Sequence, residues 1–158
     1  ADRLAPRPEV PRRLVEVPEP DEPGLTRDFE LTDRRINGKL MDMNRIDFTA
    51  DGGATELWRA YNADQAPHNF HVHGLSFQVR SVGGAPPPPH LRGWKDTVYL
   101  SPHTWYELVV PLPEHTDPDT PYLVHCHLVA HEDQAMMAQF VVVEPGASPG
   151  QVPTHHHG

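Results

Sequence analysis

The sequence contains almost no cysteine and no long apolar run, and each of these absences excludes a class of protein. The single cysteine among 158 residues excludes an intrachain disulfide and zinc sites built from paired CxxC motifs. No run of about 18 apolar residues occurs, so no membrane-spanning segment is predicted. Thirteen Lys and Arg against 22 Asp and Glu give a formal charge of −9, which disfavours nucleic acid as a partner.

Cationic side chains are also missing from one half of the chain. No Lys or Arg follows Lys95, whereas eight Asp and Glu lie between Asp96 and the last residue. This half is either a solvated acidic face or a region whose charge balances bound cations. Histidine, by contrast, is abundant, with 12 residues, and the functional argument depends on their positions.

Proline content and short apolar runs divide the chain into three parts. Residues 1–25 are expected to form a proline-rich connector, residues 26–145 one domain, and residues 146–158 a disordered tail whose three histidines are tail or tag residues. Within the domain, short runs rich in Val, Phe, Tyr and Leu with frequent turn signals predict an all-β sandwich or barrel. The expected strands are 28–32, 55–62, 69–82, 96–100, 105–111, 122–126 and 138–144, with one helical turn within 127–134.

Six histidines and the cysteine gather in two short segments, HNFHVHG at 68–74 and HCHLVAH at 125–131. Side chains two residues apart on a strand project to the same face. His71 and His73 are therefore expected to point together. The same spacing predicts that the side chains flanking Cys126 point together while the thiol points to the other side. One segment could then serve two metal sites, of which only one takes the thiolate.

The site around Cys126 can be completed on chemical grounds. His131 and Met136 follow it closely, and His68 remains from the first segment. Two imidazoles, a thiolate and a weak thioether are the ligand set of a blue-copper electron-transfer site. The competing interpretation is a small buried hydrophobic cysteine among unrelated histidines, but chance does not account for so many residues in metal-ligand spacing. Three further histidines are expected to be surface residues: His90, His103 and His115.

Both segments resemble elements of a known family. HNFHVHG is similar to the HPxHxHG element of multicopper oxidases, and HCHLVAHEDQAM is similar to their HCHxxxHxxxxM element. ING, DMNRID and GWKDTV also resemble the bacterial three-domain group, which includes laccases, spore-coat laccases, bilirubin oxidases and cuprous oxidases. The resemblance runs from about Thr26 to Glu144. It implies a Greek-key, cupredoxin-like β-sandwich or barrel, and it implies that residues 26–145 are the C-terminal cupredoxin domain of such an oxidase.

The resemblance also implies copper as cofactor and a role for each matching residue. His68, Cys126 and His131 would bind the mononuclear type 1 copper, with Met136 as its axial ligand. The remaining matches fall on a trinuclear cluster, with His71 on type 2 copper, His73 and His125 on one type 3 copper, and His127 on the other.

By the same resemblance, a small reducing substrate would give single electrons to type 1 copper. These electrons would pass through Cys126 to the trinuclear cluster, which reduces dioxygen to water. Glu132 matches an acidic position that assists protonation of reduced oxygen, although it could equally be an exposed turn carboxylate. The family members with this chemistry are extracellular or periplasmic, which sets the expected location.

The sequence departs from the family in its histidine count. The family's trinuclear cluster takes eight histidines, and this chain supplies four. The other four are expected from N-terminal cupredoxin domains, whether fused, cleaved or on a separate chain, and the isolated chain is expected to be inactive as an oxidase. Asn69 also replaces a common proline, and Ala130 a frequent glutamate. Two other functions stay open, a stand-alone electron-transfer cupredoxin and a metal-storage protein.

Overall fold

The computed structural model describes residues 17–150 of the chain. The first 16 residues of the expected connector and residues 151–158 of the expected tail, which include its three histidines, lie outside the described residues. The first strand begins at Leu25, and the last ends at Val143. No helix in the described part is long and apolar enough to cross a membrane.

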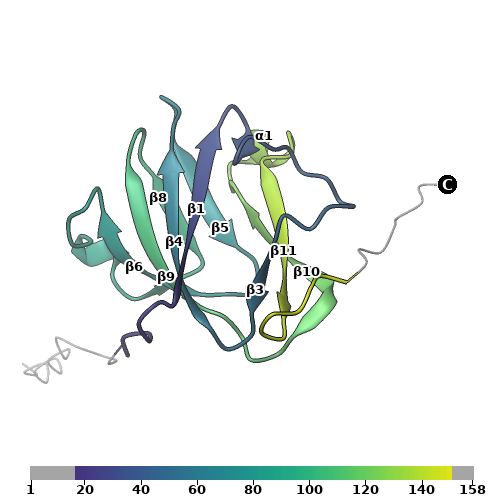
Figure 1. Cartoon of the computed structure of the whole chain (residues 1–158). Helices are drawn as coiled ribbons and strands as arrows, with labels where there is room; N and C mark the ends of the chain where they lie inside the picture. The colour runs from purple at the N-terminus through teal and green to yellow at the C-terminus, as the bar shows by residue number, and fades with distance from the viewer. Residues whose placement is uncertain (1–16, 151–158) are drawn as a thin grey trace, which may run out of the picture.

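Two sheets curl around a shared core (Figure 1). The first sheet has the strand order β2-β1-β4-β9-β6-β7, and the second has the order β3-β11-β10-β5-β8. Most neighbours are antiparallel, but β1 pairs with β4, and β3 with β11, in parallel. The prediction of an all-β sandwich or barrel is confirmed. The strands of the first sheet are β1 Leu25–Thr32, β2 Arg35–Ile36, β4 Thr55–Asn62, β6 Phe77–Val82, β7 Trp94–Lys95 and β9 Trp105–Pro111; those of the second are β3 Phe48–Asp51, β5 His68–Val72, β8 Thr97–Leu100, β10 Asp117–His125 and β11 Met137–Val143.

Alternation of side chains places the core between the sheets. In β4 every second residue is buried, as the period of two predicts for a strand with one face on a core. Phe29 and Trp58 from the first sheet meet Phe70 and Phe140 from the second, with ring centroids 5.2 to 6.3 Å apart. These edge-to-face aromatic contacts join the two sheets.

The longest expected strand is wrong in its extent. The run 69–82 is not continuous, because β5 ends at Val72 and β6 begins at Phe77 in the other sheet. Gly74 has a φ of +68° at this crossing, a conformation that glycine adopts without strain. The expected strand 122–126 is also one residue too long, because β10 ends at His125 and Cys126 lies just beyond it. Cys126 therefore directly follows the strand, where successive side chains need not point to alternate faces of the sheet.

The short elements were missed for physical reasons. β2 and β7 have two residues each, β3 is the polar segment Phe48–Asp51, and the 3₁₀ helix Pro89–Leu91 follows a proline run. The start of β10 is polar and carries a bulge between Asp117 and Tyr122. The period of apolar residues cannot indicate such segments, because they are strands only through their backbone hydrogen bonds to a neighbouring strand. The predicted helical turn is present as α1, Val129–Glu132.

Candidate metal centre

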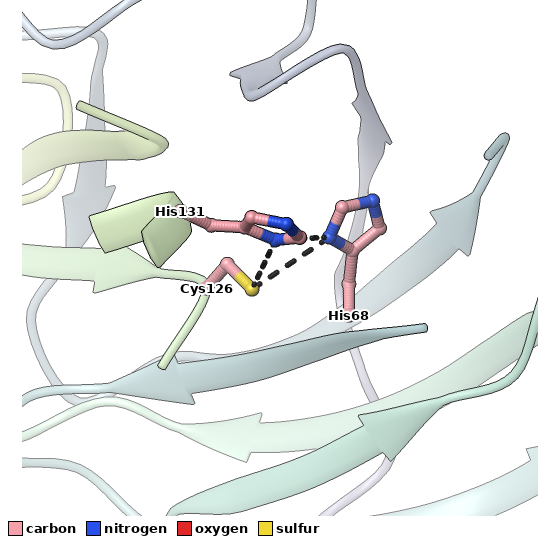
Figure 2. Close-up of side chains that lie close together, drawn as sticks. All are labelled: His68, Cys126 and His131. Carbon is pink, nitrogen blue, oxygen red and sulfur yellow. Dashed lines mark hydrogen bonds between the residues drawn. The ribbon is translucent and has the colours of Figure 1, made fainter. Parts of the chain in front are cut away.

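Three side chains converge at one end of the sandwich (Figure 2). His68 begins β5, Cys126 follows β10, and His131 lies in α1. The two Nδ1 atoms of the histidines are 3.1 Å apart, and the Cys126 Sγ lies 3.7 Å from that of His68 and 3.5 Å from that of His131. His68 and Cys126 are buried, and His131 is half-buried. We call these three residues the thiolate group.

The thiolate group has the dimensions of a metal site. A circle through its three donor atoms has a radius of about 2.0 Å, within the range of about 2.0 to 2.3 Å for imidazole and thiolate bonds to a first-row metal. Burial lowers the pKa of His131, which favours its neutral, ligating form. Burial raises the pKa of the Cys126 thiol, and the facing amides of Asn69 and Leu128 oppose that rise. A bound cation is therefore what would hold this sulfur as a thiolate.

Asp64 orients the buried histidine of the thiolate group, and the sequence analysis missed it. Its Oδ2 lies 2.9 Å from Nε2 of His68 and also accepts the backbone N–H of Asp33, while its Oδ1 accepts the Thr32 hydroxyl. Burial raises the pKa of Asp64, but these hydrogen bonds outweigh it and the net pKa is lowered. The His68 proton thus belongs on Nε2, which leaves the Nδ1 lone pair for a metal. An aspartate four residues before a candidate metal-ligating histidine was the signal available in the sequence.

Met136 is tied to the thiolate group through its backbone. Its carbonyl accepts the N–H of Cys126 at 3.1 Å, and its own N–H donates to the carbonyl of His131 at the same distance. The side chain is fully buried. The structure therefore brings Met136 beside the group, as the sequence spacing predicts, and its role as an axial ligand stays a prediction.

Four further histidines form a second group at the other side of the Cys126 backbone. The Nε2 atoms of His73 and His125 lie 2.9 Å apart. The ring of His71 is 5.0 to 5.2 Å from the rings of His73, His125 and His127, and those of His125 and His127 are 5.2 Å apart. The expected pairing of side chains two residues apart is thus present in both segments. We call these residues the imidazole group.

Hydrogen bonds determine which ring nitrogen of His71 and of His125 is left for a metal. His71 Nδ1 donates to the Asp96 carbonyl at 2.9 Å, and His125 Nδ1 faces the Cys126 carbonyl at 3.2 Å. Because carbonyl oxygens only accept, both rings keep an Nε2 lone pair for a metal. Loss of water contact is the main cause that lowers the pKa of His125, which is buried, and of His73, whose residue is exposed but whose ring packs against His71 and His125, so both favour the neutral form.

Glu132 reaches the edge of the imidazole group from the end of α1. Its Oε2 lies 3.6 Å from Nδ1 of His127 and 3.9 Å from Nδ1 of His125, and its side chain is 35 % exposed. The carboxylate is therefore half-buried, with one side toward solvent and the other toward the two histidines. It thus lies between solvent and the imidazole group.

The remaining histidines of the described residues lie outside both groups. His90, His103 and His115 are exposed, as predicted for surface residues. His103 occupies a left-handed turn with a φ of +52°, and His90 lies in the short 3₁₀ helix.

Comparisons with known proteins show the family to which the chain is similar. Residues 14–146 match the family described as multicopper oxidase. The multicopper oxidase mco of Staphylococcus haemolyticus is 39 % identical over 111 residues, which are 68 % of this chain and 24 % of that protein. The cell division protein FtsP of Dickeya dadantii is 41 % identical over 118 residues, 73 % of this chain and 24 % of that protein. The chain thus spans about a quarter of the curated relatives it matches.

Solved structures show the same fold. The laccase-like multi-copper oxidase CueO of Ochrobactrum sp. aligns with a TM-score of 0.74 and 35 % identity, over 82 % of this chain and 33 % of that one. The McoA multicopper oxidase of Aquifex aeolicus aligns with a TM-score of 0.76 and 29 % identity, over 85 % of this chain and 33 % of that one. The expected cupredoxin-like fold is confirmed. The chain belongs to the multicopper oxidase family.

Proposed function

We propose that the chain is a copper domain of a laccase-like oxidase and carries one complete type 1 site. His68, Cys126 and His131 would hold the metal, with Met136 as the weak axial ligand. The single observation that carries this proposal is the convergence of two Nδ1 atoms and one sulfur at metal-binding separations. Thiolate and imidazole together favour copper over the hard cations, and a methionine suits no zinc structural site. Since one relative is named for cell division, the donor set rather than family membership supports copper.

The imidazole group would provide half of a trinuclear copper site. His71 would serve type 2 copper, His73 and His125 one type 3 copper, and His127 the other. His73 is exposed and the His127 side chain is 53 % exposed, so both face outward as they would toward a second domain. N-terminal cupredoxin domains would complete the site with four more histidines, in keeping with a chain that spans a quarter of its relatives.

Copper bound at the two groups would supply single-electron uptake from a small reducing substrate and the four-electron reduction of dioxygen to water. The protein contributes the connection between the groups. Cys126 is bonded directly to His125 and to His127, so the thiolate group and the imidazole group share one short stretch of backbone. Glu132, beside His127, would assist proton transfer to reduced oxygen.

The remaining proposals follow from the family. Residues 26–145 would be the C-terminal cupredoxin domain, preceded by a connector at 1–25 and followed by a tail at 146–158. The whole oxidase would work outside the cytoplasm, in the periplasm or the extracellular medium. Without a second domain, the chain would bind copper at the thiolate group but would not turn over dioxygen.

Copper loading of the purified chain tests the proposal. The histidines at 155–157 bind stray metal, so they are replaced by alanine in every sample. We expect one tightly bound copper per chain and an intense blue thiolate-to-copper band. Cys126→Ser should lose the band, whereas the exposed His115→Gln should keep it. A colourless chain, or a blue band that survives in Cys126→Ser, would reject the type 1 assignment.

The mass and copper content of the native protein test the second half of the proposal. An oxidase assembled from this chain and domains with two further HxH motifs should hold four coppers. A homogeneous native protein of 17.8 kDa that holds one copper and carries electrons without reducing dioxygen would instead be a stand-alone cupredoxin.

A further inference from the structure

The Cys126 sulfur accepts a backbone hydrogen bond from Asn69, the second residue of β5. The amide nitrogen of Asn69 lies 3.4 Å from Sγ with the N–H directed at it. Cys126 is fully buried, and Asn69 is half-buried. This amide is not a metal ligand, yet it contacts the atom that the proposed type 1 copper would bind most strongly.

Strand pairing explains why the amide points at the sulfur. In β5, successive amides face opposite neighbours: Val72 donates to Asp96 beside β8, and His73 donates to Leu123 of β10. Asn69, four residues before His73, therefore faces β10. β10 ends at His125, so no strand carbonyl lies opposite Asn69, and the Cys126 side chain takes that place. The sulfur thus accepts the hydrogen bond that a further strand carbonyl of β10 would otherwise accept from Asn69.

We propose that the Asn69 amide raises the reduction potential of the type 1 site by stabilising the electron-rich sulfur of its reduced state. This inference rests on the proposed function of the thiolate group. Reduction adds one negative charge to the metal–thiolate unit, so a hydrogen bond to the sulfur favours the reduced form more than the oxidised one. Hydrogen bonding around the cysteine sulfur is one of the variables that set the potential of such sites.

The amide is a property of this chain rather than of its motif. The resembling element HPxHxHG has proline at this position, and proline carries no N–H. A chain with that proline has the same copper ligands and lacks this hydrogen bond. Asn69 therefore makes this chain a stronger oxidant toward its donor than an otherwise identical chain with proline.

Asn69→Pro removes this donor without removing a hydrogen bond to β8: Asn69 lies opposite Tyr99 of β8, but its amide points the other way, to the Cys126 sulfur. The residue before proline must be extended, and His68 already lies in a strand. Asn69→Ala is the matched control, since it removes the side chain and keeps the N–H. Both variants are loaded with copper, and their potentials are measured by redox titration of the blue band.

The expected result is a lower potential in Asn69→Pro than in the parent chain. A net hydrogen-bond contribution of about 1.4 kcal/mol corresponds to a tenfold change in the ratio of oxidised to reduced protein at a fixed potential, or about 59 mV for one electron. Asn69→Ala should stay close to the parent. Equal potentials in Asn69→Pro and Asn69→Ala, with the blue band present in both, would overturn the inference and leave the type 1 site standing. Absence of the band in the parent chain would remove the type 1 site itself.

A second measurement needs no variant and so does not depend on Asn69→Pro folding. The chain is loaded with ¹¹³Cd, which is diamagnetic and binds thiolate, and its amide spectrum is recorded. A hydrogen bond from the amide to the metal-bound sulfur should transmit a scalar coupling from ¹¹³Cd to the Asn69 amide proton. A Cys126-bound cadmium without coupling at this amide would contradict the inference.

Discussion

Replacement of Asp64 by alanine should weaken copper binding, although Asp64 is not a proposed ligand. Its carboxylate holds Nε2 of His68 at 2.9 Å, and it is itself held by Thr32 and the Asp33 amide at 3.0 Å each. Without it, the buried imidazole has no acceptor for its Nε2 proton and can place the proton on Nδ1, where it competes with the metal. Loss of such a partner typically costs about 10- to 100-fold in metal affinity, or about 1.4 to 2.7 kcal/mol.

The assay is competition between the chain and a chelator of known copper affinity, with Asp33→Asn as matched control. Asp33→Asn removes one negative charge near His68, as Asp64→Ala does. The Asp33 carboxylate, however, pairs with Arg35 at 2.7 Å and does not contact His68. We expect Asp64→Ala to fall in affinity by at least tenfold and Asp33→Asn to stay within about twofold, since exposed ion pairs contribute little. Equal losses in the two variants would show that charge alone acts at the site. An unchanged affinity in Asp64→Ala would refute the orienting role.

Three further substitutions follow from the packing around the two groups. Met136→Leu should keep the blue band and raise the potential, because a weak axial ligand tunes the site; loss of copper in this variant would contradict the axial assignment. Gly74→Ala should lower the free energy of unfolding by about 1 to 3 kcal/mol in denaturant titration, since its φ is +68° and a Cβ would approach the Tyr122 ring to 3.1 Å. Gln139→Leu should cost about 1 to 3 kcal/mol in the same assay, because the buried amide donates to three backbone carbonyls of the 42–45 loop; an unchanged midpoint would show that water replaces it.

The strands that a sequence can indicate are those with a buried face. β4 and β9 were predicted with the observed bounds because their apolar residues alternate or run without interruption. The two-residue strands β2 and β7 have no such signal, because their pairing depends on a neighbouring strand. The break at Gly74 was hidden because apolar residues continue on both sides while the chain crosses from one sheet to the other.

The two groups follow from spacing, but their surroundings do not. Pairs two residues apart predicted the convergence of the imidazoles and the separation of Cys126 from them. The spacing of Asp64 and His68 was a signal that the sequence analysis missed, whereas the Asn69 amide had none, because its contact depends on where β10 ends. The prediction that the strand extends to Cys126 was wrong by one residue. Because β10 ends at His125, the Cys126 sulfur lies opposite the Asn69 amide.

X-ray absorption at the copper edge tests the central claim most directly, since it counts ligands around the metal without relying on activity. The sample is the chain with alanines at 155–157 and one equivalent of copper. The account predicts one sulfur and two imidazole nitrogens, the nitrogens at about 2.0 Å, and loss of the sulfur in Cys126→Ser. A copper surrounded only by nitrogen and oxygen in the parent chain would contradict it.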